Sequence, residues 1–160
     1  MPSTHLRFQQ AMNSLAIRHL KRAGSSAPGA TVTARDSIDF VVDGSSLLDS
    51  LVKSGGGHGD FMGCFVRGFP IENERKKAQL TSAGEPDTEG GRYLLYLCPE
   101  CGDIGCGAYG AKIRVTEETT EWYDFAYENG YEPARVLTSV GSFSFARRDY
   151  DATLEAATEV

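Results

Sequence analysis

Short apolar and β-branched runs, separated by glycine, proline and charged turns, dominate the middle and the end of the chain. Residues 37–44, SIDFVVDG, form one such run that ends in Asp-Gly, and residues 92–97, RYLLYL, form another. Apolar and charged side chains alternate in residues 111–118, AKIRVTEE, and residues 120–126 carry an aromatic run that precedes an Asn-Gly turn. These features are typical of β-strands, and the short connections between the later runs predict an antiparallel meander.

Two segments are predicted to be helical. Residues 45–53, SSLLDSLVK, begin with serines that can cap a helix and continue with leucines on one face. The last segment, from about Ala146, places Tyr150, Leu154 and Ala157 toward the core. Strands and helices together predict an α+β fold with one mostly antiparallel sheet and helices packed on one face.

The region between residues 54 and 91 is less regular. Residues 54–60, SGGGHGD, lack the Gly-Lys-Ser/Thr ending of a phosphate-binding loop and are expected to form a plain connection. Residues 61–69, FMGCFVRGF, are largely apolar and predict a buried strand. Residues 70–91 are polar and end in proline and glycine, which indicates a surface excursion with one short strand at residues 78–82.

The N-terminal segment differs from the rest in pattern and charge. Apolar residues recur close to helical spacing in residues 6–22, and residues 23–32, AGSSAPGATV, are typical of a linker. We therefore expect residues 1–32 to be a basic, helical or poorly ordered segment with its linker. Residues 33–160 are then a single α+β domain. An acid-free opening that carries arginine is also typical of an organelle transit peptide.

Charge is distributed unevenly along the chain. The net charge is −6, but the first 35 residues hold five basic residues and no acid, and the remainder holds 22 acids against 11 lysines and arginines. The excess of acids after residue 35 disfavours nucleic acid as a partner, because each phosphate contact requires a positive group. It would attract a basic protein or merely keep the chain in solution. No apolar run approaches the roughly 20 residues that span a bilayer, and no secretory signal opens the chain, so we expect a cytoplasmic protein without a membrane partner.

The densest chemistry lies in residues 93–113, YLLYLCPECGDIGCGAYGAKI, which hold three of the four cysteines. Cys98 and Cys101 enclose a Pro-Glu pair and precede a glycine, which is the pattern of a zinc knuckle. Cys106 follows between two glycines that let the chain fold back, so it could be a third ligand. The pattern predicts zinc as the cofactor of this segment.

The fourth ligand of such a site is not evident from the spacing, although a structural zinc normally has four. Cys64 and His58 are the candidates elsewhere in the domain, and Asp103 is the candidate inside the motif. Two other interpretations stay open. Catalytic thiol chemistry usually needs a thiolate at a helix N-terminus, and the four glycines of residues 102–110 disfavour a helix there. A glycine-rich turn with small buried cysteines is the second alternative.

Residues 121–133, EWYDFAYENGYEP, combine aromatic and acidic side chains. Aromatic anchors among acids suit a surface that binds another protein. Core aromatics beside a solvated acidic edge would give the same pattern. The candidate partner-binding residues are Trp122, Tyr123, Asp124, Tyr127 and Glu128.

The cysteine segment and the aromatic segment together resemble a group of small uncharacterised bacterial proteins. Residues 98–108 match the pattern C-P-x-C-G-x-x-G-C-G-A, residues 122–129 match W-x-D-F-x-x-E-N, and a final helix that bears a tyrosine follows. The resemblance covers about residues 38–157. Such sequences are sometimes loosely labelled oxidoreductases and are also similar to small acidic immunity proteins.

The sequence therefore favours a non-enzymatic, acidic binding protein. We expect it to recognise a basic, toxin-like protein in the manner of an immunity or antitoxin factor, with a cysteine-rich turn that could hold zinc as a structural element. The alternative is a thiol- or metal-dependent oxidoreductase that uses the clustered cysteines. A serine hydrolase is disfavoured, because the chain has no G-x-S-x-G motif.

Overall fold

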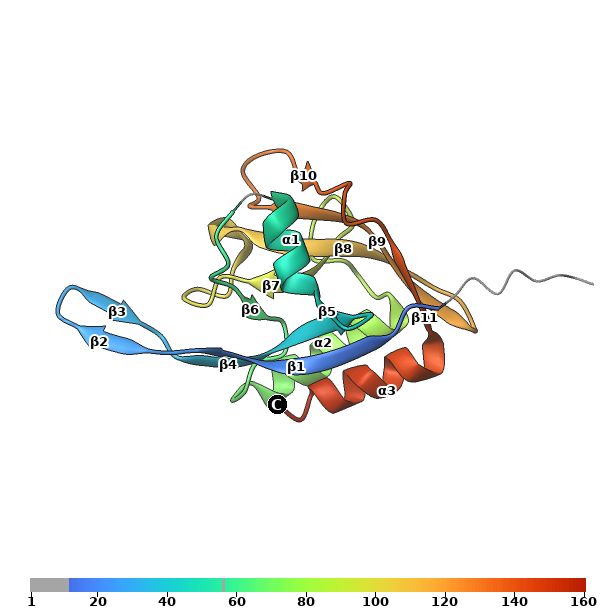
Figure 1. The fold of residues 1–160 in the computed structure, drawn as a ribbon, viewed down its shortest axis with the longest axis horizontal. Coiled ribbons are helices and arrows are strands. Elements are labelled where there is room, and N and C mark those ends of the chain that lie inside the picture. Colours follow the sequence, from blue (N-terminus) through green and yellow to red (C-terminus); the bar gives the residue numbers. More distant parts are fainter. Residues whose placement is uncertain (1–11, 56) are drawn as a thin grey trace, which may run out of the picture.

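In the computed structural model, which describes residues 12–55 and 57–160, three α-helices pack around antiparallel β-structure (Figure 1). None of these helices is long and apolar enough to cross a membrane. The elements in chain order are β1 (Leu15–Arg22), β2 (Ser25–Ala27), β3 (Ala30–Val32), β4 (Arg35–Val42), β5 (Ser45–Ser46), α1 (Leu47–Gly55), β6 (Met62–Gly63), α2 (Pro70–Ser82), β7 (Tyr93–Leu97), the 3₁₀ turn η1 (Ile104–Cys106), β8 (Ala108–Val115), β9 (Thr119–Glu128), β10 (Arg135–Val136), β11 (Phe143–Ala146) and α3 (Arg147–Ala157).

The largest sheet contains six antiparallel strands in the described part of the chain. Its order is β10-β9-β8-β7-β6, and β11 pairs with the first half of β9. The predicted meander is confirmed for β7, β8 and β9, which are consecutive in sequence and neighbours in the sheet. The three strands predicted at residues 92–97, 111–118 and 120–126 correspond to these strands with small shifts at their ends. The cysteine segment is the connection between β7 and β8.

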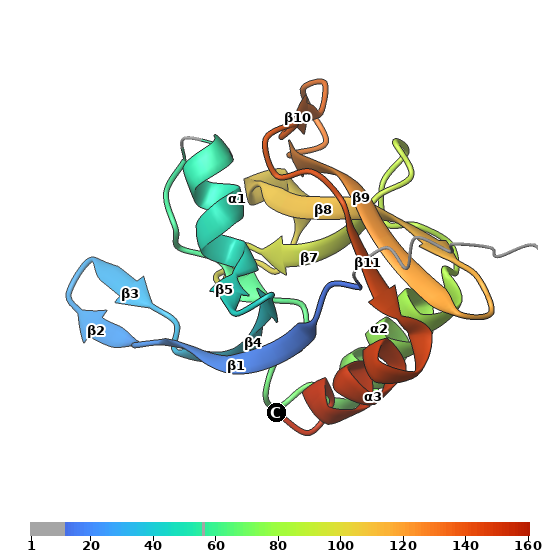
Figure 2. The same cartoon turned by 45° about the vertical axis from the view of Figure 1, so that its right-hand side comes forward.

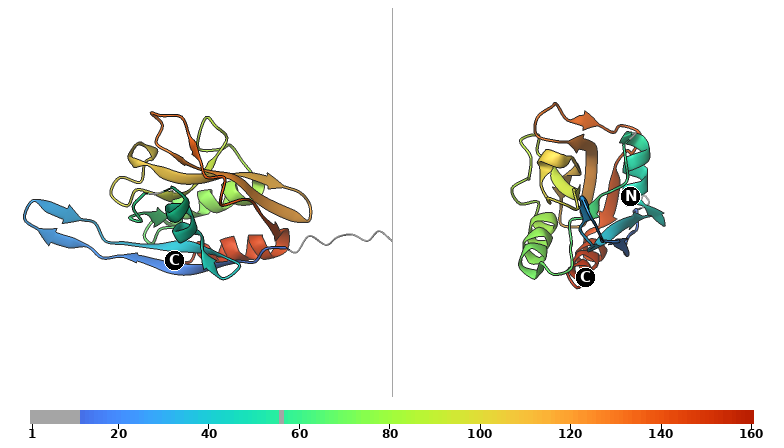
Figure 3. Two further views of the ribbon diagram at one scale, coloured as in Figure 1. Left: turned by 45° about the horizontal axis from the view of Figure 1, so that its top comes forward. Right: turned by 90° about the vertical axis from the view of Figure 1, so that its left-hand side faces the viewer.

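The first two long strands form a ribbon of their own. β1 pairs antiparallel with β4 from Leu15 opposite Val42 to Arg22 opposite Arg35, and β5 adds a short third strand. The hairpin β2–β3 continues this ribbon and projects from the body of the molecule (Figures 1 and 3). The α+β class and the antiparallel pairing are therefore confirmed. The prediction of one sheet is wrong, because the described strands divide among three sheets.

Strand β1 corrects the helix predicted over residues 6–22, whose first residues lie outside the described part of the chain. Leu15, Ile17 and Leu20 pack against the core, and exposed side chains lie between them. Apolar residues two and three positions apart fit a strand as well as a helix, so the pattern alone does not choose. Residues 15–22 form a strand because they pair with β4. The expected linker, residues 23–32, contains the hairpin β2–β3.

Helix α2 replaces the surface excursion and short strand predicted for residues 70–91. Pro70 occupies the first turn, where its missing N–H costs nothing, and strong helix formers follow. Asn73 and Leu80 are its only buried residues, so the helix has almost no apolar stripe for a pattern to reveal. Ala83 ends the helix in the left-handed conformation, with φ of 48°.

The segment predicted as a strand at residues 61–69 is largely buried, but only β6 within it is a strand. β6 passes very close to β4, since a Cβ added to Gly63 would lie 1.7 Å from the carbonyl oxygen of Ile38. The chain then bends, and the side chain of Asn73 replaces a strand partner. Its Oδ1 accepts from the N–H of Val66 at 3.0 Å and its Nδ2 donates to the carbonyl of Val66 at 2.9 Å.

Two helix predictions are confirmed. The first helix is α1, and the N–H of Asp49 donates to Oγ of Ser46 at 3.1 Å, which is the expected serine cap. The last helix is α3, and it begins at Arg147. Helices α2 and α3 lie side by side and are joined by contacts, whereas α1 lies apart from them (Figure 2).

An aromatic cluster connects the large sheet to the ribbon and the helices. Trp122 of β9 is fully buried and packs edge-to-face on Phe40 of β4, with ring centroids 5.1 Å apart. Its Nε1 donates to Oη of Tyr150 at 3.2 Å, and that hydroxyl donates to the carbonyl of Leu80 at 2.9 Å. Tyr150 therefore ties α3 to both β9 and α2. Large buried aromatics of this kind contribute much of the energy of a core.

Candidate metal centre

The connection between β7 and β8 begins with a tight turn. The N–H of Gly102 donates to the carbonyl of Cys98 at 2.8 Å, and Gly102 has φ of 65°, a conformation that side-chain-bearing residues rarely adopt. Pro99 stands at the start of the turn, where its fixed φ is favourable. The sequence Cys-Pro-Glu-Cys-Gly thus forms the knuckle that its pattern predicts.

A second turn brings Cys106 back to this knuckle. The 3₁₀ turn η1 is capped by Asp103, whose Oδ1 accepts from the N–H of Gly105 at 2.6 Å. Gly107 follows with φ of 93°, and a Cβ there would lie 2.1 Å from Oη of Tyr127. Only glycine fits this position, which explains why the chain can reverse there.

The three sulfur atoms converge. The Sγ atoms of Cys98, Cys101 and Cys106 all lie within 4.8 Å of one another, and Cys101 and Cys106 are 2.8 Å apart. Two sulfurs bound to one tetrahedral zinc at about 2.3 Å each are roughly 3.8 Å apart. Small side-chain movements would therefore place all three thiolates on one zinc ion, so the residues fit the predicted cofactor.

The local electrostatics act in opposite directions on the thiols of Cys98 and Cys106. Burial acts to raise the pKa of Cys98, but the backbone N–H groups of Cys101 and Glu100 aimed at its sulfur outweigh this effect and lower it. The pKa of Cys106 is raised to about 12, because its thiol is hydrogen bonded to the sulfurs of Cys101 and Cys98. A bound cation would supply the positive charge that holds all three as thiolates.

The knuckle is braced from outside by residues at the base of the β2–β3 hairpin. The carboxylate of Glu100 accepts from Nη1 of Arg22 at 2.6 Å and from Oγ1 of Thr33 at 2.8 Å. Arg22 holds the pKa of Glu100 at about 2, with help from Thr33. Nε of Arg35 donates to the carbonyl of Pro99 at 2.8 Å. The cysteine loop, residues 98–107, is thus fastened to the first strands of the chain.

Sequence reasoning missed this brace. The positive charge of the first 35 residues is the available signal, but the sequence pattern predicts a separate basic segment and linker there. Arg22 has two acidic partners far along the chain, Glu100 and Asp60, and its Nε lies 2.7 Å from the carboxylate of Asp60. Such pairings depend on tertiary structure and have no local pattern.

Of the three candidates for a fourth ligand, Cys64 and His58 lie outside the cluster of three cysteines, and Oδ1 of Asp103 accepts from the N–H of Gly105. Cys64 is buried after β6, where burial raises the pKa of its thiol to about 11. His58 stacks on Phe61 with ring centroids 5.1 Å apart, and its Nδ1 accepts from the N–H of Asp60 at 3.3 Å. Among the described residues, neither joins a group whose ligand atoms could surround one ion with the cysteines.

The predicted partner-binding residues occupy different environments. The structure places Trp122 in the core, with no exposed surface, so its side chain is not available to a partner. Tyr123 and Tyr127 are half-buried, and their rings lie beneath the guanidinium groups of Arg114 at 4.6 Å and Arg135 at 5.0 Å.

The two acidic candidates are already paired within the chain. Asp124 has Oδ2 at 2.9 Å from both Nη2 of Arg92 and Nζ of Lys112. Glu128 lies 3.6 Å from Nη1 of Arg92 and is largely buried. The negative charge of both carboxylates is therefore partly neutralised within the chain.

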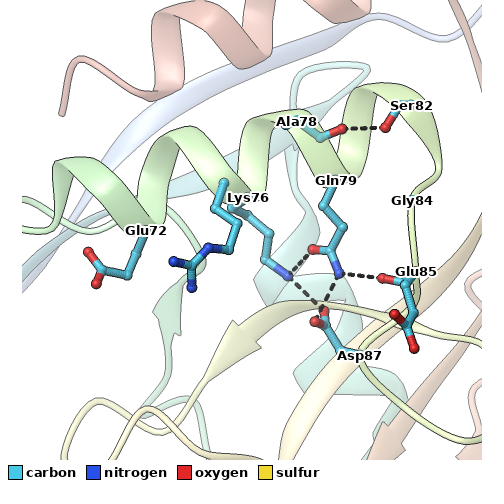
Figure 4. A pocket seen from close by; sticks show the side chains of 9 residues that line it. Glu72, Lys76, Ala78, Gln79, Ser82, Gly84, Glu85 and Asp87 are labelled. Carbon is cyan, nitrogen blue, oxygen red and sulfur yellow. Dashed lines mark hydrogen bonds and ion pairs between the residues drawn. The ribbon is translucent and has the colours of Figure 1, made fainter.

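A separate hollow lies beside α2 and the chain that follows it (Figure 4). Its polar groups bind one another: Nζ of Lys76 lies 2.7 Å from Oδ2 of Asp87, and Nε2 of Gln79 donates to Oδ1 of Asp87 at 2.9 Å. Nε2 of Gln79 also donates to the carbonyl of Glu85 at 2.9 Å. This network closes the C-terminal part of α2 onto the following loop, while the exposed charged side chains of Glu72, Arg75 and Glu85 also line the hollow.

Comparisons of this chain with protein-family models, with characterised proteins and with solved structures gave no match. The resemblance carried by residues 98–108 and 122–129 therefore stays a prediction.

Proposed function

We propose that the protein is a non-enzymatic binding protein whose cysteine loop is fixed by a structural zinc ion. The convergence of Cys98, Cys101 and Cys106 within 4.8 Å is the observation that carries the zinc proposal. Glycines in left-handed conformations on both turns shape this loop, and the brace from the first strands holds it in place. A regular helix, which would lower the pKa of an attacking thiolate, does not begin at the knuckle.

Elemental analysis by mass spectrometry of protein purified without chelators tests the zinc proposal. We expect one zinc per chain, and we expect its loss in Cys98→Ser, Cys101→Ser and Cys106→Ser. Cys64→Ala is the matched control, because this cysteine lies outside the cluster, and it should retain the metal. Absence of zinc in the folded wild-type protein would overturn the proposal.

The proposed partner is a basic protein of the toxin type. The acidic balance after residue 35 supports this, because opposite charge accelerates encounter. Affinity capture at low salt followed by native mass spectrometry should give a stoichiometric complex with one basic protein, and association should slow as salt is raised. If the rate of association did not change in high salt, the proposed role of charge would be contradicted.

A dithiol oxidoreductase is the second candidate, and the 2.8 Å between the sulfurs of Cys101 and Cys106 favours it. The two functions differ in thiol reactivity at pH 6. The zinc proposal expects slow alkylation of every cysteine in the metal-loaded protein, whereas the redox function requires one fast thiolate. A rapidly alkylated cysteine in the zinc-loaded protein would decide for the oxidoreductase.

A further inference from the structure

A cavity of about 340 Å³ lies between the first turns of α2, strand β6 and the cysteine knuckle. Its volume is within the range of small-molecule sites, which begins at about 300 Å³. Cys101 and Gly102 form the wall that faces the candidate metal centre. Much of the remaining wall is apolar and consists of Met62, Val66, Phe69 and Leu97.

Arg35 supplies an unneutralised positive charge to this cavity. Its Nε donates a hydrogen bond to the carbonyl of Pro99, and its guanidinium carbon lies 5.8 Å from the ring centroid of Phe69. No carboxylate of the described residues lies within ion-pair distance of its remaining N–H groups. The arginine is therefore held in one orientation by two contacts while its outer edge keeps donors for a ligand.

The other polar side chains of the cavity wall either bind groups of the protein itself or lie at the rim. Nζ of Lys76 pairs with Asp87, as described above, and both polar atoms of the Asn73 side chain bind the backbone of Val66. Glu72 is exposed and also borders the hollow beside α2. Its negative charge would disfavour a ligand with two negative charges.

We propose that this cavity binds a small monocarboxylate with an apolar body. The carboxylate pairs with the guanidinium of Arg35, which matches its planar geometry, and the apolar body packs against Met62, Val66 and Leu97. This inference goes beyond the proposed function, because the ligand needs no bond to zinc. It rests on that function in one respect: zinc would fix the knuckle that forms one wall.

Octanoate is a suitable probe, and its binding to the zinc-loaded protein can be measured by titration calorimetry. We expect one octanoate per chain, with chemical-shift changes confined to methyl groups of Met62, Val66 and Leu97 in NMR spectra. Octan-1-ol should bind at least about tenfold more weakly, because it lacks the charge for Arg35. Equal binding of the alcohol, or no binding of octanoate, would overturn the proposal.

Three variants locate the site. Arg35→Gln should weaken octanoate binding about tenfold or more, and Val66→Phe should abolish it by filling the cavity without touching a charge. Arg67→Gln is the matched control: this arginine is 73% exposed, lies outside the cavity and is 3.7 Å from Asp36, so binding should be unchanged. Full affinity in Val66→Phe would overturn the proposal even if Arg35→Gln proved unstable.

Zinc content, measured on the same samples, separates this proposal from the previous one. A protein that lacks zinc and still binds octanoate would refute only the metal site. A protein that holds one zinc and ignores octanoate would refute only the carboxylate site.

Discussion

At the scale of single residues, Asp124 in β9 adopts a backbone conformation that its neighbours in the strand do not share. Asp124 has φ of 52° at the point where the register between β8 and β9 shifts. Its carbonyl accepts from Nε of Arg92 at 2.8 Å, while its carboxylate pairs with Lys112 and with the same arginine. The bulge is therefore held by both the backbone and the side chain of one residue.

The charge of Asp124 should make stability depend on pH. Lys112 and Arg92 lower the pKa of this carboxyl below its ordinary value of 3.8 in the folded protein. Its contribution is therefore present above that value and lost as pH falls through the folded pKa. Asp124→Asn keeps a residue that tolerates positive φ, so we expect it to lose about 1 kcal/mol of unfolding free energy at pH 7.

Urea denaturation from pH 7 to pH 2 measures this difference. The gap between wild type and Asp124→Asn should close below pH 3.8. Glu117→Gln, which alters an exposed carboxyl, should show no such gap. A gap that persists at the lowest pH would show that the charge is not its source.

At the scale of elements, β6 and β4 cross with their backbones in close contact at Gly63 and Ile38. β6 can approach β4 only because Gly63 has no side chain, since its Cβ would meet the backbone of Ile38. Backbone oxygen cannot move aside as a flexible side chain can. The crossing also positions the wall of the cavity and the buried Cys64 that follows.

Gly63→Ala should therefore lower the unfolding free energy by about 3 kcal/mol or more. Gly59→Ala is the control, because a Cβ there meets no atom within 4 Å and the residue does not have positive φ. Thermal denaturation followed by circular dichroism measures both variants. Similar melting temperatures for the two variants would contradict the conclusion that β6 can approach β4 only with glycine at position 63.

The elements differ in how far the sequence predicts them. β7, β8 and β9 have apolar runs bounded by turns, and α1 and α3 have one apolar face, so their patterns are sufficient. α2 is nearly all polar and is stabilised by its composition and by contacts with α3, such as Lys77 with Glu155 at 2.6 Å. β1 depends on β4 as its partner. An element specified by tertiary contacts leaves no apolar period in the sequence, as in α2, or one that fits both a strand and a helix, as in β1.

At the scale of the whole molecule, the candidate metal centre and the aromatic core are separate. Cys101 and Cys106 are exposed on a surface turn, whereas Trp122 and Tyr150 have their own hydrogen bonds in the core. The local spacing of the cysteines was enough to predict that they converge. The residues that brace them belong to distant strands, so no spacing could have revealed them.

Removal of the proposed zinc ion should consequently loosen one region and leave the rest folded. After chelation we expect amides of residues 98–107 to lose protection in hydrogen exchange, while the fluorescence of Trp122, the only tryptophan, stays unchanged. A matched sample of Cys106→Ser should show the same local loss without chelator. Loss of tertiary structure throughout the chain on chelation would contradict the separation of site and core.

Arg22 joins four segments through one guanidinium, since Asp60, Glu100 and the carbonyl of Thr33 all accept from it. The hairpin and the cysteine loop are therefore not thermodynamically independent. Any molecule that binds the hairpin and displaces this arginine must change the affinity of the cysteine loop for the proposed zinc ion. By reciprocity the ion must change the affinity for that molecule by the same factor, so occupancy of the hairpin can be sensed in the cysteine loop.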